Sequence, residues 1–291
     1  MDKFLVNGGK SLFGTVQISG AKNAVLPIMA ATIIAPGKYC IKNVPSLRDT
    51  YTMKRLLEMS GAVILFKNNI MNIDTSDCSN PIAPYDLVKT MRASFYILGP
   101  FMSRFNHAEV SLPGGCAWGP RPVDLHLMAL EKLGADVSLS NGMIVAKGRL
   151  KGAFISFQTS SVGATGNAIM AAVKAKGETI IENAAREPEI ESLCIFLNKM
   201  GANINGVGTD VLTIIGQDEL HAGIEYEIIP DRIEAGTFLL AAAITKGKIV
   251  LNNVYPDHMR IVLEYLEKSG VEIDANTKSI HINAINSSIS P

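Results

Sequence analysis

The feature that most limits the fold of this 291-residue chain is a stretch of sequence that recurs four times along it. Three copies share a glycine followed six positions later by an asparagine, in the pairs Gly37 and Asn43, Gly177 and Asn183, and Gly247 and Asn253. Gly177 lies 140 residues after Gly37, and Gly247 lies 70 residues after Gly177. The remaining copy, around 106–113, has the same shape with these landmarks replaced. Repetition at this spacing indicates a fold assembled from one supersecondary unit.

Each copy predicts the same series of elements, a βαβαββ unit. In the first copy we expect a strand at 15–18, an apolar helix at about 22–34, a strand at 38–43, an amphipathic helix at 49–59 and a hairpin at 68–69. Strands that alternate with helices predict an α/β protein. The first helix is apolar nearly all round, which is typical of a helix that is buried on every side. We therefore expect the first helices at the centre, with the sheets wrapped around them, which is an inside-out α/β barrel.

The spacing of the copies also predicts two domains. The first helices of the four copies begin at Lys22, Arg92, Val162 and Arg232. Three complete copies at 20–229 predict one domain, and the fourth copy predicts an incomplete second domain built from 1–19 and 230–291. A fifth copy would begin at about residue 302, beyond Pro291.

Composition excludes several classes of function. The chain has 27 Lys and Arg residues and 27 Asp and Glu residues, so no net charge recruits nucleic acid or an anionic membrane. Its four cysteines are far apart and form no C-x-x-C pair, which argues against disulfides and zinc and for a reducing compartment. No apolar run reaches ~18 residues, and the N-terminus has no signal-peptide core. We expect a cytoplasmic, soluble protein that uses neither metal nor cofactor.

The stretch 113–126 is the strongest candidate for a functional loop. It contains three glycines, three prolines and the single tryptophan of the chain, so we expect a loop with a held shape. Cys116 lies within it, with Arg121 five residues later, and a nearby cation favours the nucleophilic thiolate. His126 is expected in the first turn of the following helix, where it can line the loop. The alternative is that Cys116 is a small buried apolar residue.

Cations and small polar residues mark the beginnings of the first helices. Lys22 opens the first, Arg92 opens the second, and Ser160, Ser161 and Gly163 surround the beginning of the third. Helix N-termini offer free amide groups to anions, although a solvated lysine and ordinary helix capping explain the same residues. Pseudo-symmetry brings these helix starts towards one end of the domain. We therefore expect Lys22, Arg92 and Arg121 to converge on one polyanionic ligand.

These residues resemble the UDP-N-acetylglucosamine 1-carboxyvinyltransferases of the enolpyruvyl transferase family. The resemblance runs from Asn7 to about Ile282 and is carried by Ser19–Ala24, Met91–Ser94, Gly114–Cys116, Arg121–His126, Ser161–Thr165, Glu182–Glu189 and Pro230–Arg232. It implies an enolpyruvate transferase-like fold and transfer of an enolpyruvyl group from phosphoenolpyruvate to the 3-hydroxyl of UDP-N-acetylglucosamine. This reaction is the first committed step of peptidoglycan precursor synthesis, and in the family the loop cysteine is the target of fosfomycin.

The resemblance also implies roles for individual residues. Lys22 and Arg121 would hold phosphoenolpyruvate, Cys116 would protonate it or trap it covalently, and Asn23 would contact the attacking hydroxyl. The nucleotide sugar would be bound by Arg92, by Arg121, Pro122, Val123, Asp124 and Leu125 at the uridine end, and by Ser161, Val162 and Gly163 at the diphosphate. The implied partners are these two small molecules, with no cofactor, no metal, no nucleic acid and no membrane.

The sequence departs from the family in length. Similar enzymes have six units and this chain has four, so the aspartate that deprotonates the sugar hydroxyl, at the head of the fifth unit, would fall just beyond the last residue, and an arginine of the last unit is also missing. Thr159 and Ser160 stand where many relatives have lysine and valine. An alternative is therefore a truncated, non-catalytic remnant that binds UDP-N-acetylglucosamine or a partner protein. The truncation predicts exposed apolar surface and association, whereas a complete enzyme would be a monomer.

Overall fold

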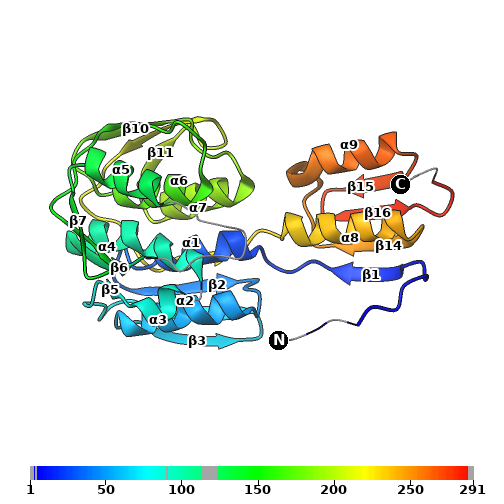
Figure 1. Ribbon diagram of the computed structural model, residues 1–291, viewed down its shortest axis with the longest axis horizontal. Coiled ribbons are helices and arrows are strands. Elements are labelled where there is room, and N and C mark those ends of the chain that lie inside the picture. Colours follow the sequence, from blue (N-terminus) through cyan, green and yellow to red (C-terminus); the bar gives the residue numbers. More distant parts are fainter. Residues whose placement is uncertain (1–2, 4, 90, 113–122, 288–291) are drawn as a thin grey trace. The chain divides into compact units, whose positions relative to one another are not determined.

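The computed structural model describes residues 3, 5–89, 91–112 and 123–287, together with the backbone but not the side chain of Arg92. Two compact units divide the chain. The large unit is Lys22–Ile229, and the small unit comprises Met1–Ala21 and Pro230–Pro291. Figure 1 shows their helices and strands.

Among the described residues, each unit is built from copies of one four-stranded sheet. The large unit has three such sheets, which in spatial order are β13 (Glu225–Glu227), β2 (Lys38–Lys42), β4 (Ile70–Asp74) and β3 (Val63–Lys67); β5 (Ile82–Ala83), β6 (His107–Ser111), β8 (Met143–Lys147) and β7 (Asp136–Ser140); and β9 (Phe154–Ser156), β10 (Glu178–Glu182), β12 (Val211–Ile215) and β11 (Asn203–Asn205). The small unit has β1 (Phe13–Gln17), β14 (Lys248–Asn252), β16 (Ser279–Asn283) and β15 (Glu272–Asn276). In every sheet the first two strands are parallel and the remaining pairs are antiparallel.

The helices repeat in the same way. Those of the large unit are α1 (Lys22–Ala31), α2 (Arg48–Met59), α3 (Tyr85–Val88), the 3-10 helix η1 (Arg92–Ile97), α4 (Leu98–Phe105), α5 (Asp124–Lys132), α6 (Val162–Ala172) and α7 (Pro188–Lys199). Those of the small unit are α8 (Arg232–Ile244), the 3-10 helix η2 (Pro256–Met259) and α9 (Arg260–Lys268). The predicted α/β class and the fourfold βαβαββ repeat are confirmed.

One expected strand belongs to a different copy. We expected 15–18 to open the sheet of the first copy, and this was wrong: β1 pairs in parallel with β14 of the fourth copy. The place beside β2 is taken by β13, which pairs in parallel over Glu225–Glu227. The exchange follows from the path of the chain, because both strands lead directly into a segment that crosses between the units. The crossing segments touch, with the amide of Asp231 donating to the carbonyl of Ser19 at 2.9 Å.

The repeated asparagines have a structural reason in this exchange. Asn43, Asn183 and Asn253 all have left-handed backbones, with φ of 56°, 53° and 54°, a region that asparagine tolerates better than most residues. Their side-chain amides donate to the carbonyls of Ile228, Phe157 and Ile18, respectively, at 2.8, 2.8 and 2.7 Å. Each asparagine therefore fixes the segment that runs from a first strand into the helix start.

Burial of the first helices differs between the two units. In α1 every residue from Ala24 to Ala31 is buried, and α6 is buried from Ala164 to Ala172. The expectation of helices buried on all sides is confirmed for these two, because α1, α6 and the η1–α4 segment pack on one another. It is wrong for α8, where the side chain of Ile244 is 79% exposed. In the described part of the small unit, α8 packs only on η2 and on strands of its own sheet.

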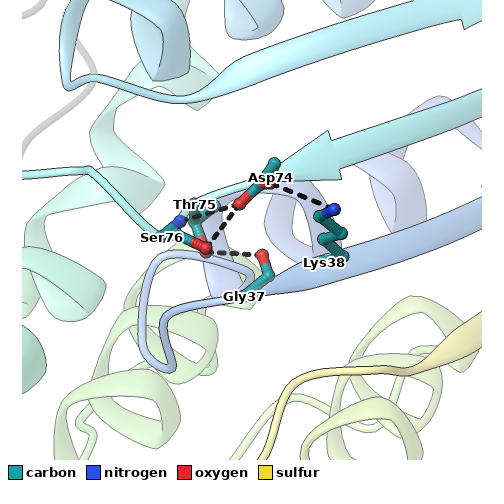
Figure 2. Close-up of polar contacts among 5 residues, drawn as sticks. All are labelled: Gly37, Lys38, Asp74, Thr75 and Ser76. Carbon is teal, nitrogen blue, oxygen red and sulfur yellow. Dashed lines mark hydrogen bonds and ion pairs between the residues drawn. The ribbon is translucent and has the colours of Figure 1, made fainter.

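The turn after β4 joins the first copy to the end of its own first helix (Figure 2). The buried hydroxyl of Thr75 donates to the carbonyls of Thr32, Ala35 and Gly37 at 3.0–3.2 Å. Figure 2 also shows the Asp74 carboxylate accepting from the amide and hydroxyl of Ser76. The hydroxyl bond, followed by the amide bond, holds the pKa of Asp74 below its usual value.

A single arginine links this turn to the second copy. Arg104, in the last turn of α4, donates from Nη1 to the carbonyls of Ile33 and Thr75 at 3.0 and 2.9 Å. Its Nη2 donates to the carbonyls of Ser76 and Cys78 at 3.3 and 3.0 Å. One guanidinium group therefore satisfies four main-chain acceptors of the neighbouring copy.

The closest approach of two central helices occurs at Gly99 of α4. A Cβ atom there would lie 2.6 Å from the carbonyl oxygen of Asn167 in α6, which is a backbone atom that cannot move aside alone. We expect Gly99→Ala to destabilise the large unit by about 1–3 kcal/mol, the usual cost of overpacking, measured by urea unfolding. Gly236→Ala in α8 is the matched control, because its Cβ would meet only Met259 at 3.9 Å. A neutral or stabilising Gly99→Ala would contradict the close packing of α4 and α6.

Candidate functional site

A cavity of about 520 Å³ in the large unit lies where several helices begin. It is lined by Lys22, Asn23, Leu26, Asp49, Met91, Ala93, Phe95, Tyr96, His126, Ser161, Val162 and Gly163. These residues come from the first turns of α1, α2, α5 and α6 and from η1. The N-terminal end of a helix carries free amide groups and a positive partial charge, so a cavity surrounded by such ends favours an anionic ligand.

The cavity gathers part of the predicted set of site residues. Lys22, Asn23, Ser161, Val162 and Gly163 all line it. Arg92 is the first residue of η1, between the lining residues Met91 and Ala93.

The rest of the predicted set lies on or before α5. Val123 precedes α5, and Asp124 and Leu125 are its first two residues. None of these three is among the described lining residues, although the next residue, His126, is. Cys116, Arg121 and Pro122 lie outside the described residues.

Lys22 is held by a carboxylate that the sequence analysis did not single out. Its Nζ lies 3.1 Å from Oδ2 of Asp49, and the two side chains are 42% and 29% exposed. Asp49 is the second residue of α2 and also lines the cavity. In the sequence it reads as an ordinary first-turn acid, because its distance from Lys22 along the chain carries no signal.

We expect Asp49→Asn to tighten binding of phosphoenolpyruvate by up to about fivefold, because a partly exposed ion pair is worth at most ~1 kcal/mol and the ligand no longer competes with the carboxylate. Isothermal titration at low and high salt measures the effect. Lys22→Met is the control, and it should abolish the salt dependence. Weaker binding by Asp49→Asn would show instead that Asp49 orients the ammonium group.

The beginning of α6 combines a helix cap with two unused amides. Ser161 has an extended backbone, and its hydroxyl accepts from the amide of Ala164 at 3.3 Å. The capping interpretation of this serine is therefore correct in the ligand-free chain. Val162 and Gly163 follow as the first two residues of α6, whose amides have no acceptor within the helix.

His126 is buried at the same end of the cavity. Only 5% of its surface is exposed, and its ring meets that of Phe95 edge-to-face with centroids 4.9 Å apart. Its Nδ1 lies 2.8 Å from Nδ2 of Asn167 in α6. The sequence analysis placed His126 near the loop but did not single out Asn167, which stands in an apolar helix without any motif.

The described cysteines are not nucleophiles at neutral pH by their surroundings. Burial raises the pKa of the Cys78 thiol to about 11 and that of Cys194 to about 12. Both thiols are therefore protonated near pH 7. The described residues contain no cluster of three or more His, Cys, Asp or Glu side chains that could bind a metal ion, and no described helix is long and apolar enough to cross a bilayer.

Residues 6–290 match the sequence profile of the family described as EPSP synthase (3-phosphoshikimate 1-carboxyvinyltransferase). A protein of Chlorobaculum parvum named UDP-N-acetylglucosamine 1-carboxyvinyltransferase is 53% identical over 98% of this chain and 68% of its own length. Proteins of the same name from Chloroherpeton thalassium and Geobacter metallireducens are also 53% identical, over 98% and 94% of this chain and 67% and 66% of their own lengths. The chain thus spans about two thirds of the length of the curated relatives it matches.

Solved structures share the fold at low sequence identity. The enolpyruvyl transferase NikO from Streptomyces tendae superposes with a TM-score of 0.83 at 22% identity, over 95% of this chain and 66% of that one. An EPSP synthase from Acinetobacter baumannii superposes with a TM-score of 0.75 at 19% identity, with the same coverage. The expected inside-out α/β architecture agrees with these neighbours.

Proposed function

This chain belongs to the EPSP synthase family and, within it, to the UDP-N-acetylglucosamine 1-carboxyvinyltransferases, and on that premise we propose which reaction its cavity serves. The reaction is transfer of the enolpyruvyl group of phosphoenolpyruvate to the 3-hydroxyl of UDP-N-acetylglucosamine. A carbon–oxygen bond forms to the sugar hydroxyl, which loses its proton, and the carbon–oxygen bond to phosphate breaks. The products are the enolpyruvyl nucleotide sugar and inorganic phosphate, and the chain is a transferase of peptidoglycan precursor synthesis.

The observation that carries the proposal is the convergence of five predicted residues on one cavity. Lys22 and Asn23 from α1 face the same space as Ser161, Val162 and Gly163 from α6, although about 140 residues separate the two groups. The substrates bring a phosphate, a carboxylate and a diphosphate. An ammonium group and two helix N-termini supply the complementary charge and amide donors.

We propose the following division of roles. Lys22 and Arg121 bind phosphoenolpyruvate, Cys116 protonates or covalently traps it, and Asn23 contacts the attacking hydroxyl. Ser161, Val162 and Gly163 bind the diphosphate, with Arg92 beside it. The uridine end is held by Arg121, Pro122, Val123, Asp124 and Leu125. Closure of the loop around Cys116 would exclude water from a reactive intermediate.

The cellular setting follows from the same proposal. We propose that the protein acts in the cytoplasm, where its product feeds cell wall synthesis and hence cell shape and division. Cys116 would be the residue that fosfomycin alkylates, by opening of the epoxide and formation of a carbon–sulfur bond. We expect the fosfomycin adduct on Cys116 and not on Cys78 or Cys194, which mass spectrometry of the intact and digested chain measures.

The proposal is tested by phosphate release from phosphoenolpyruvate by the 291-residue chain, with and without UDP-N-acetylglucosamine. Release that depends on the nucleotide sugar, together with an enolpyruvyl product identified by mass spectrometry, is the expected result. Binding of UDP-N-acetylglucosamine without release would instead assign the non-catalytic binding role. Neither binding nor release would overturn both functions.

A further inference from the structure

The hydrogen bonds of Asn167 fix the orientation of its side-chain amide. Asn167 is only 1% exposed and lies in the middle of α6. Its Oδ1 accepts from the amide of Gly99 at 2.8 Å, and its Nδ2 donates to the carbonyl of Phe95 at 3.0 Å. An amide N–H needs an acceptor and a carbonyl needs a donor, so a flipped Asn167 would lose both bonds.

This orientation also fixes the proton on His126. The second hydrogen of Asn167 Nδ2 is directed at His126 Nδ1, 2.8 Å away. A nitrogen that accepts a hydrogen bond carries no proton, so Nδ1 is the unprotonated nitrogen of the ring. The imidazole is therefore neutral with its proton on Nε2, since an imidazolium would set two donors against each other.

The protonated nitrogen lies at the beginning of α6. A Cβ atom on Gly163 would lie 3.1 Å from both Cε1 and Nε2 of His126. The absence of a side chain at Gly163 thus lets the edge of the ring approach the first turn of the helix. Both residues line the same cavity, so Nε2–H and the first amides of α6 belong to one group of neutral donors.

We propose that Asn167 is a positioning residue that holds His126 as a neutral Nε2–H donor to a diphosphate oxygen of the bound nucleotide sugar. This inference rests on the proposed function for the identity of the ligand, but not for the tautomer. A diphosphate offers only acceptors, so a tautomer that presents an acceptor at Nε2 would repel it. The lock by Asn167 keeps the donor facing the cavity before the ligand arrives.

The test is a long-range ¹H–¹⁵N correlation spectrum of the histidine rings in the 291-residue chain, without ligand and with UDP-N-acetylglucosamine. We expect the Nε2–H tautomer for His126 in the free chain and a shift of its Nε2 resonance on binding. Asn167→Asp presents an acceptor to Nδ1, so it should move the proton to that atom or protonate the ring. Loss of one neutral hydrogen bond should weaken binding about 2- to 10-fold.

Ser103→Ala is the matched control, because the Ser103 hydroxyl also bridges α4 and α6, with a bond to the Met170 carbonyl, without touching His126. It should lower stability and leave the tautomer and the affinity unchanged. Should Asn167→Asp not fold, His126→Phe removes the donor while keeping a ring, and it should weaken binding by the same factor.

Three results would overturn the inference. An Nδ1–H or imidazolium form of His126 in the wild-type chain would reject the lock. An unchanged Nε2 resonance, while the Val162 and Gly163 amides shift with UDP-N-acetylglucosamine, would reject the contact to the ligand. No shift at His126 or at either amide would reject the contact together with the proposed function, and the behaviour of the two amides separates these last two cases.

Discussion

Replacing Cys116 by alanine is expected to lower nucleotide-sugar-dependent phosphate release by about 10²–10⁴-fold, the usual cost of removing a group that transfers a proton in the transition state. The thiol is proposed to protonate phosphoenolpyruvate or to add to it. Alanine can do neither, whereas the cavity that binds the nucleotide sugar is built from other residues. The affinity for UDP-N-acetylglucosamine should therefore stay within about threefold of wild type, since an exposed substitution away from the ligand rarely changes a free energy by more than ~0.5 kcal/mol.

The matched control is Cys194→Ala, whose thiol is buried and has a pKa raised to about 12 by its burial. It should leave turnover unchanged per folded molecule. Alkylation at pH 7.5 gives a second readout, because a group with a pKa that far above the pH is almost entirely protonated and unreactive. Equal loss of turnover in both variants would place the effect in folding instead of chemistry.

Arg104→Ala should produce the largest loss of stability, about 3–4 kcal/mol in the large unit. The guanidinium group donates to four main-chain carbonyls of the first copy, and hydrogen bonds to a charged group contribute ~1.5–3 kcal/mol each before losses to water. Ile33, one of the acceptors, is fully buried and would lose its partner. Differential scanning calorimetry should show a melting temperature lower by about 6–16 °C for a unit of this size.

Two further substitutions separate the hydrogen-bond geometry from the charge. Arg104→Lys keeps the charge but not the planar fork, so it should recover less than half of the lost stability. Arg260→Ala removes an arginine whose ion pair with Asp257 is exposed, at 75% and 88%, and should change stability by less than ~0.5 kcal/mol. Full recovery by lysine would show that charge alone stabilises the turn.

The repeat made most of the fold predictable, because equivalent landmarks impose equivalent local structures. The strand that begins each copy was the exception. β1 and β13 have ordinary strand sequences, and nothing local distinguishes a partner in the same copy from one in another. Their exchange depends on where the chain crosses between the units. The exposure of Ile244 was also unpredictable from its own helix, which is as apolar as α1.

The candidate site shows the same limit. Lys22 and Gly163 were predictable because helix starts are marked by local composition, and the repeat indicated that those starts converge. Asp49 and Asn167 were not, since each acts on a partner that is distant in sequence, and an isolated acid or amide in a helix carries no signal. His126 was singled out for its place after the loop, but its tautomer depends on Asn167.

The exchange of β1 and β13 has a consequence for the order in which the protein folds on the ribosome. Phe13 pairs with Lys248, and Cys40 pairs with Glu225. At a synthesis rate of about 5–20 residues per second, β1 is made roughly 10–50 s before its partner emerges. The first strand to leave the ribosome is thus among the last to be paired, and its edge stays open throughout. A ribosome that stalls before residue 225 would release a chain with two incomplete sheets, each a template for pairing with another nascent chain.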